Sequence, residues 1–168
     1  MDLDPLSDYA ASMLSFTYYV AGKLTQALEM AQRAMELEPE SFLAFVLHSE
    51  GRYEETLAIA QGGLAISGRH PMFMAMLAVT YAEWRKPADA ESVHAELLAR
   101  SVREYVSPFL LAVSASACGD QDEAIGSLSK ACEIRDLQLR AFGKHWPGSH
   151  RLREDPRFEG IVAGIGLN

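Results

Sequence analysis

The chain has 168 residues, of which 49% are hydrophobic and 23% charged, a balance typical of a folded protein. Its formal net charge is −8 and no run of Lys or Arg is present, which disfavours a nucleic-acid-binding surface. The acidic start "MDLDPLSD" is not a secretion signal, and no apolar run approaches the roughly 18 residues of a membrane span, so we expect a cytoplasmic protein with no membrane contact.

Similar helical segments follow three glycines, Gly22, Gly51 and Gly119, and Arg85 stands at the equivalent place in a fourth segment. The intervals between these positions are 29, 34 and 34 residues. Self-similarity at about 34 residues is typical of a helix–turn–helix array. The spacing therefore predicts four helix pairs, with one helix before each turn and one after it.

In chain order, the predicted repeats span about residues 8–36, 37–70, 71–104 and 105–136. The second repeat is five residues short, so its first helix, near residues 40–50, should be brief. "LDP" at Leu3–Pro5 matches "LEP" at Leu37–Pro39, the end of the first repeat. We therefore expect residues 1–7 to end a preceding repeat, in a chain taken from a longer array.

Small residues recur in the second helices, five residues after each turn position: Ala27, Thr56, Ala90 and Ala124. Seven residues later, on the same helix face, come Ala34, Gly63, Leu97 and Ala131. The first helices carry apolar pairs at i, i+4, namely Leu14 and Tyr18, Leu43 and Leu47, Leu77 and Tyr81, and Leu111 and Ala115. These patterns predict close contacts between the paired helices.

The tail, residues 137–168, is out of phase with the repeats. It predicts a short helix, a turn at Pro147–Gly148, a loop containing a buried Trp146, and a last helix beginning at Asp155-Pro156. Phe158, Ile161, Val162 and Ile165 form an apolar stripe on that last helix. We expect the tail to be a helical cap on the repeat array, residues 1–136.

The repeated pattern resembles the tetratricopeptide repeat family over about residues 8–136. The resemblance implies an all-α fold, a right-handed α-α superhelix of about four helix–turn–helix repeats with a C-terminal capping helix. The tail and "EYVSPFLLA" (Glu104–Ala112) also resemble the C-terminal tetratricopeptide segments of large bacterial signalling proteins. That resemblance implies a regulatory module attached to another domain.

Candidate chemical groups are sparse. The histidines are His48, His70, His94, His145 and His150, and only the last two are close in sequence. Two histidines are fewer than a zinc site needs, so no metal, cofactor or catalytic residue is predicted. His94 is expected to be a hydrogen-bonded packing residue, and Cys118 and Cys132 packed thiols. A hydrolase built around His145 and His150 is the enzymatic alternative.

The resemblance to this family also implies a concave groove lined by the first helices. The residues that we assign to a peptide-binding groove are Ser12, Phe16, Tyr19, Phe45, His48, Met72, Val79, Glu83, Phe109, Val113 and Ser116. The groove is apolar and aromatic with almost no cation, which disfavours a clamp for a peptide's terminal carboxylate. Its occupant is predicted to be a partner's apolar peptide or helix, a second copy of the chain, or neighbouring helices, the chain's own tail included.

These observations predict a non-enzymatic scaffold that binds another protein, within a larger bacterial signalling polypeptide. The alternative is a structural spacer or homodimerisation element with no separate ligand.

Overall fold

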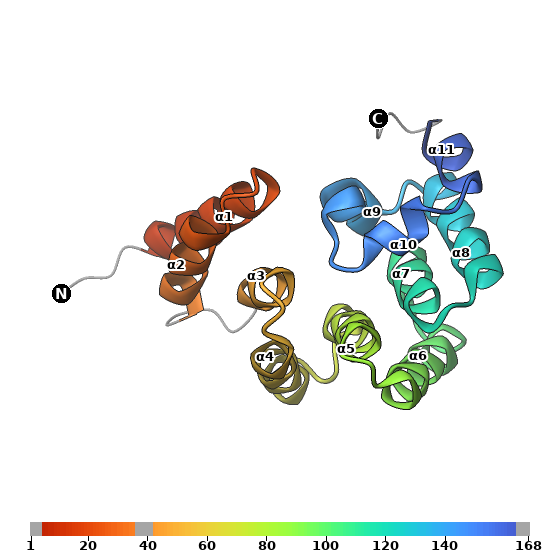
Figure 1. Cartoon of the computed structure of the whole chain (residues 1–168), viewed down its shortest axis with the longest axis horizontal. Coiled ribbons are helices and arrows are strands. Elements are labelled where there is room, and N and C mark those ends of the chain that lie inside the picture. The colour runs from red at the N-terminus through yellow and green to blue at the C-terminus, as the bar shows by residue number, and fades with distance from the viewer. Residues whose placement is uncertain (1–4, 36–41, 164–168) are drawn as a thin grey trace. The chain divides into compact units, whose positions relative to one another are not determined.

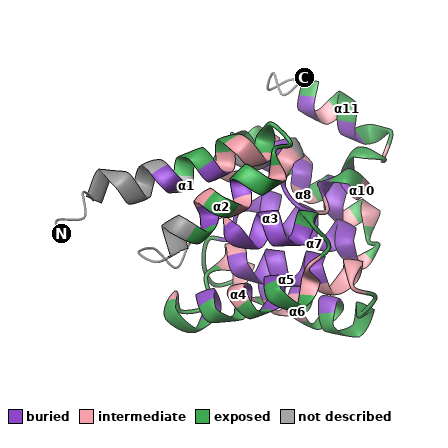
Figure 2. Cartoon of the chain, turned by 60° about the vertical axis from the view of Figure 1, so that its left-hand side comes forward, coloured by how far each residue is buried: buried purple, intermediate pink, exposed green. Residues whose placement is uncertain are grey.

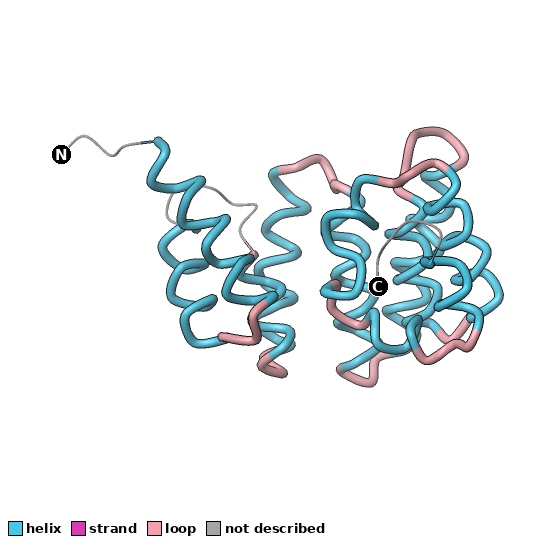
Figure 3. Tube along the Cα trace, turned by 90° about the horizontal axis from the view of Figure 1, so that it is seen from above, coloured by secondary structure: helices cyan, strands magenta, loops and turns pink. Residues whose placement is uncertain are grey.

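The computed structural model describes residues 5–35 and 42–163, and every regular element in these ranges is a helix (Figure 1, Figure 3). The predicted all-α class is therefore confirmed. The chain divides into two compact units, Met1–Gly68 and Arg69–Asn168. None of the described helices combines the length and the apolar content needed to cross a bilayer.

The first unit contains two helix pairs, α1 (Pro5–Val20) with α2 (Leu24–Met35), and α3 (Leu43–Ser49) with α4 (Tyr53–Ile66). α2 also packs against α3, so the pairs are stacked. The short α3 confirms the brief helix predicted for the second repeat. α1 begins at Pro5, earlier than predicted, and Leu3, which was also assigned to a preceding repeat, lies outside the described residues.

The second unit contains two more helix pairs, α5 (Pro71–Glu83) with α6 (Pro87–Ser101), and α7 (Pro108–Cys118) with α8 (Gln121–Glu133). Three of these helices have proline near the N-terminus, where its missing N–H costs no hydrogen bond. α7 packs against both α5 and α6. Figure 2 shows α5 and α7 buried along most of their length, as expected for the central helices of this unit.

The tail belongs to this second unit. It forms α9 (Leu137–Phe142), a 3₁₀ turn (Gly143–His145), α10 (Ser149–Arg153) and α11 (Arg157–Val162). α10 corrects the prediction of a loop after Pro147–Gly148, because the left-handed Gly148 starts a further helical turn. Phe158 and Val162 are buried as predicted, Ile161 is half-buried, and Ile165 lies outside the described residues.

The four predicted turn positions share one backbone geometry. Their φ angles are +71° at Gly22, +72° at Gly51, +57° at Arg85 and +88° at Gly119. In each turn the following N–H donates to the carbonyl five residues earlier, at N···O distances of 2.8–3.1 Å: Lys23 to Tyr18, Arg52 to Leu47, Lys86 to Tyr81, and Asp120 to Ala115. This bond defines the Schellman motif, and its recurrence confirms the predicted turn positions.

Arg85 is therefore a side-chain-bearing residue in a conformation that glycine adopts without steric cost. We expect Arg85→Gly to raise the free energy of unfolding by about 0.5–1 kcal/mol, because the relief of left-handed strain exceeds the added chain entropy. Chemical denaturation measures the change. Arg135→Gly, at φ +55°, should behave alike; a loss of stability in both would show that φ does not control these turns.

The small residues of the second helices are packed as predicted where the structure describes their side chains; the side chain of Ala34 lies outside the described residues. Ala27, Thr56, Ala90 and Ala124 are all 0% exposed. Ser15 of α1 also donates a 3.0 Å hydrogen bond to the carbonyl oxygen of Ala27, across the first helix pair. Helix backbones can approach this closely only where the intervening side chain is short.

A larger side chain at such a contact should overpack it. We expect Ala124→Leu to lower the free energy of unfolding by about 1–3 kcal/mol, seen as a lower melting temperature. Ala95→Leu, on the exposed face of α6, is the matched control and should change stability by less than about 0.5 kcal/mol. Equal effects at the two sites would contradict the close packing of α8.

The apolar stripes of the first helices agree with prediction except in α1. Leu43, Leu77 and Leu111 are buried, whereas Leu14 is 45% exposed. Leu43 packs in a cluster with Leu28 and Ala31 of the preceding helix α2. α1 packs against α2 through another part of its surface, so the expectation of a buried Leu14 is wrong.

Candidate peptide-binding surfaces

The first unit gathers four aromatic rings from α1 and the start of α3, here called the aromatic cluster: Phe16, Tyr19, Phe42 and Phe45. Neighbouring ring centroids are 4.8–6.4 Å apart, the range in which aromatic pairs attract each other. The Ser49 hydroxyl lies 3.4 Å from that of Tyr19 and joins α3 to α1. The cluster is a set of mutually contacting rings to which α1 and the start of α3 both contribute.

Residues of this cluster differ in exposure. Phe16, Tyr19 and Phe42 are half-buried, but Phe45 is 4% exposed and contacts Tyr19 and Phe42 edge-on. His48 is also buried, with its ring against Tyr53 at 5.4 Å. Phe45 and His48 therefore pack inside the protein instead of lining an open groove, and the Ser12 side chain lies outside the described residues.

Sequence reasoning missed Phe42, which it did not assign to the groove. Its ring lies closest to Phe16, with centroids 4.8 Å apart. The signal was available, because Phe42 and Phe45 are three residues apart and so share a face once the helix begins.

In the second unit, the predicted groove residues lie on one surface of α5 and α7, here called the α5–α7 face and defined by Val79, Glu83, Phe109, Val113 and Ser116. All except Glu83 are buried. The tail covers part of this face, since α9 and α10 pack against α7, on its side away from α6 (Figure 1). Met72, in the first turn of α5, stays half-buried. The expectation of an open groove is therefore not met here.

The covering segment inserts Trp146, which is 2% exposed and meets Phe109 edge-on at 6.0 Å. Arg151 completes the contact, its Nε lying 3.3 Å from Oε1 of Glu83. Of the occupants considered for the predicted groove, the structure places the chain's own tail here. The burial of Trp146 was predicted from the sequence. Its contact with Phe109 was not predicted, because no spacing rule links residues of the tail to a helix far along the chain.

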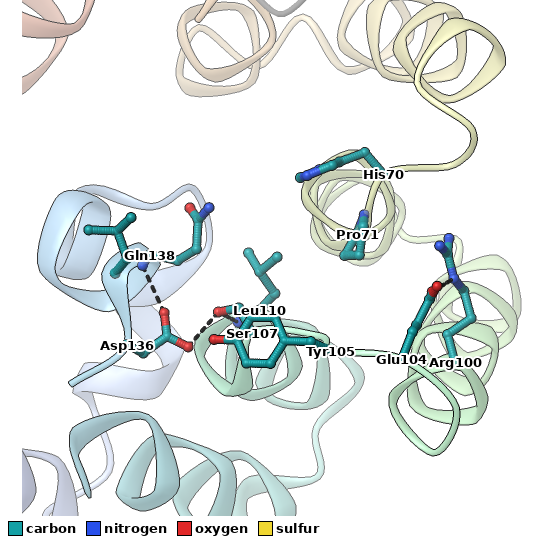
Figure 4. A pocket seen from close by; sticks show the side chains of 10 residues that line it. His70, Pro71, Arg100, Glu104, Tyr105, Ser107, Leu110, Asp136 and Gln138 are labelled. Atoms are coloured by element: carbon teal, nitrogen blue, oxygen red, sulfur yellow. Dashed lines mark hydrogen bonds and ion pairs between the residues drawn. The ribbon is translucent and has the colours of Figure 1, made fainter. Parts of the chain in front are cut away.

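A separate pocket of about 340 Å³ opens between the N-terminus of α5, the C-terminus of α6 and the start of α9 (Figure 4). The Asp136 carboxylate on its wall accepts hydrogen bonds from the Ser107 hydroxyl at 2.7 Å and from the Gln138 N–H at 2.7 Å. Tyr105 is largely exposed, and partial desolvation of its hydroxyl, followed by the neighbouring Asp136, raises the pKa of that hydroxyl. Ser107 caps α7 and Asp136 caps α9, so both polar groups have structural roles.

His94 stands in a Ser–His–carboxylate arrangement that joins three helices. Its Nδ1 lies 2.9 Å from Oγ of Ser114 and its Nε2 lies 3.4 Å from Oε2 of Glu123. Ser114 is fully buried and donates to the Leu111 carbonyl oxygen, so no substrate could reach its hydroxyl. The contact confirms His94 as a hydrogen-bonded packing residue. Within residues 5–35 and 42–163, no three His, Cys, Asp or Glu side chains are placed so that they could hold a metal ion together.

The two cysteines are free thiols in partly buried sites. Burial, and then the negative charges of Glu91, Glu123 and Asp120, raises the pKa of Cys118 to about 11. A raised pKa keeps the thiol protonated at neutral pH, and the thiolate is the reactive form.

We expect iodoacetamide at pH 8 to alkylate Cys118 about 100-fold more slowly than a thiol of ordinary pKa, and the rate to rise tenfold per pH unit. Mass spectrometry of the Cys132→Ser chain measures this rate. Alkylation of Cys118 as fast as in the urea-unfolded chain would contradict the burial.

No protein-family model matches the chain, and no curated protein matches it.

Proposed function

We propose that the chain is a non-enzymatic scaffold that binds an apolar peptide or helix of another protein. Its helix pairs would be tetratricopeptide repeats stacked in a right-handed solenoid, acting in the cytoplasm as a regulatory module of a larger bacterial signalling protein. Support for the repeat assignment comes from the recurring Schellman turns and the small buried residues of the second helices.

The aromatic cluster of the first unit is the observation on which this function depends. Its half-buried members, Phe16, Tyr19 and Phe42, offer apolar area with little side-chain freedom left to lose on binding. The rings are held by one another, so the surface is formed before a partner arrives. Preformed aromatic surfaces of this kind are typical energetic centres of protein interfaces.

Selection of a random peptide library against the full chain tests this function. Selected peptides should carry aromatic or aliphatic residues at helical spacing, and Phe16→Ser should weaken their binding at least about tenfold. Thr17→Ser, next to Phe16 but exposed, is the matched control and should leave binding unchanged. Selected peptides that bind Phe16→Ser and the parent chain equally would contradict the assignment.

The homodimerisation alternative is favoured by further exposed apolar residues of α1. Met13, Leu14 and Val20 of α1 are 38%, 45% and 39% exposed, an unusual density of large apolar side chains on one helix. Light scattering separates the two functions. A stable dimer that Leu14→Glu converts to a monomer, together with no selected peptide, would establish the spacer role instead.

A further inference from the structure

The part of the tail that packs against the α5–α7 face runs from α9 to α10, residues 137–153, and is here called the tail segment. It is built like a bound peptide, with its largest apolar side chain, Trp146, at the centre. The Trp146 ring stands at 89° to that of Phe109, and both residues are almost completely buried. Leu139 and Leu152, on either side of Trp146 in sequence, are buried as well. An aromatic anchor with aliphatic neighbours is the usual energetic core of a peptide interface.

The backbone after this anchor is fitted to α5. Gly148 lies so close to Val79 that a Cβ added to the glycine would be 2.4 Å from Cγ1 of Val79. Gly148 also has φ +75°, which turns the chain into α10. A tight turn without a side chain is thus a requirement of this face.

A basic residue ends the segment. Besides its contact with Glu83, Arg151 donates from Nη1 to the carbonyl oxygen of Ala117 at 3.3 Å. Ala117 lies in the last turn of α7, where carbonyl groups attract positive charge. The face therefore complements an arginine placed five residues after the aromatic anchor.

This segment has little structure of its own. α9, the 3₁₀ turn and α10 contain 6, 3 and 5 residues, too short to be stable helices when undocked. Residues just outside the segment attach both its ends to the helix pairs. Asp136, which precedes the segment, accepts a hydrogen bond from Ser107, and Arg157, which follows it, pairs with Asp122 of α8. A segment that undocked would therefore remain attached at both ends.

We propose that residues 145–151 are a built-in ligand of the α5–α7 face, and that this face binds a partner peptide of the same chemistry: an aromatic residue, a tight glycine turn, then an arginine. This inference rests on the proposed function in treating the helix pairs as a protein-binding scaffold, but it uses a different surface. The tail competes with the partner because its tethered ends give it a high effective concentration.

Hydrogen exchange of the full chain tests whether the tail undocks by itself. The amides of α10 should exchange at least about tenfold faster than those in the centre of α7, because local opening costs less than global unfolding. Equal rates in the two helices would overturn the proposal, since the tail would then be an inseparable part of the core.

A fluorescent peptide of residues 143–153 tests the face directly. Arg151→Gln weakens the tail but leaves the face intact, so this chain should bind the peptide at least about tenfold more tightly than the parent chain does. The same peptide with the tryptophan replaced by alanine should not bind. Failure of the folded Arg151→Gln chain to bind, or equal binding of the two peptides, would overturn the proposal. Neither result involves Phe16, so each is distinct from a failure of the proposed function.

Discussion

Replacing Gly148 by alanine should lower the free energy of unfolding by about 2–4 kcal/mol, among the largest effects of adding a single methyl group to this chain. Two costs combine at this position. The φ of +75° disfavours any residue with a Cβ, and the new Cβ would lie 2.4 Å from Cγ1 of Val79. Chemical denaturation measures the loss.

Gly119→Ala separates the two costs. Gly119 has φ +88° in the same unit, but nothing lies within 4 Å of its would-be Cβ, so its loss should be only about 1 kcal/mol. In a Val79→Ala background, Gly148→Ala should lose no more than Gly119→Ala does. If Val79→Ala gives no such relief, the tail does not approach α5 as the structure shows.

Phe45→Asp should unfold the helix pairs of the first unit, with a loss of about 4 kcal/mol or more. Phe45 is 4% exposed and packs edge-on against two other rings, so the aspartate would be a buried charge with no cation within the aromatic cluster. If Phe45 lined an open groove, as its assignment to the peptide-binding residues predicts, the same change would leave the melting temperature unchanged and abolish binding. The burial of Phe45 reverses that expectation.

Circular dichroism of the variant measures the lost helix content. Ala58→Asp, on the exposed face of α4, is the control for adding a negative charge and should cost less than about 1 kcal/mol. If Phe45→Asp melts like the parent chain, Phe45 lines an accessible surface and belongs with Phe16 in the binding site.

The local features of the fold were predictable because each depends on residues near in sequence. A left-handed turn requires glycine or tolerates a strained residue, so Gly22, Gly51 and Gly119 marked the turns. Alanine-sized residues at fixed distances from those turns marked the helix contacts. The missed helix α10 is short and depends on docking, so no periodic pattern indicated it.

Candidate site residues were predicted less well, because exposure depends on what covers a helix face. The apolar character of Phe16, Phe45, Val79 and Phe109 is equally compatible with an open groove and with a core. Only the packing distinguishes them: Phe16 stays half-exposed in the aromatic cluster, while Trp146 covers Phe109.

The sequence by itself determined the all-α class, the turn positions and the small-residue contacts, since these follow from backbone conformation and from periodicity within about 34 residues. Only the tertiary structure decided which apolar faces remain available. Residues of the tail reach α5 and α7 from far along the chain, and the fit of Trp146 and Gly148 to that face depends on shape and on distances between elements. Hydrophobic burial is non-directional, so an apolar stripe shows that a face is covered without showing which segment covers it.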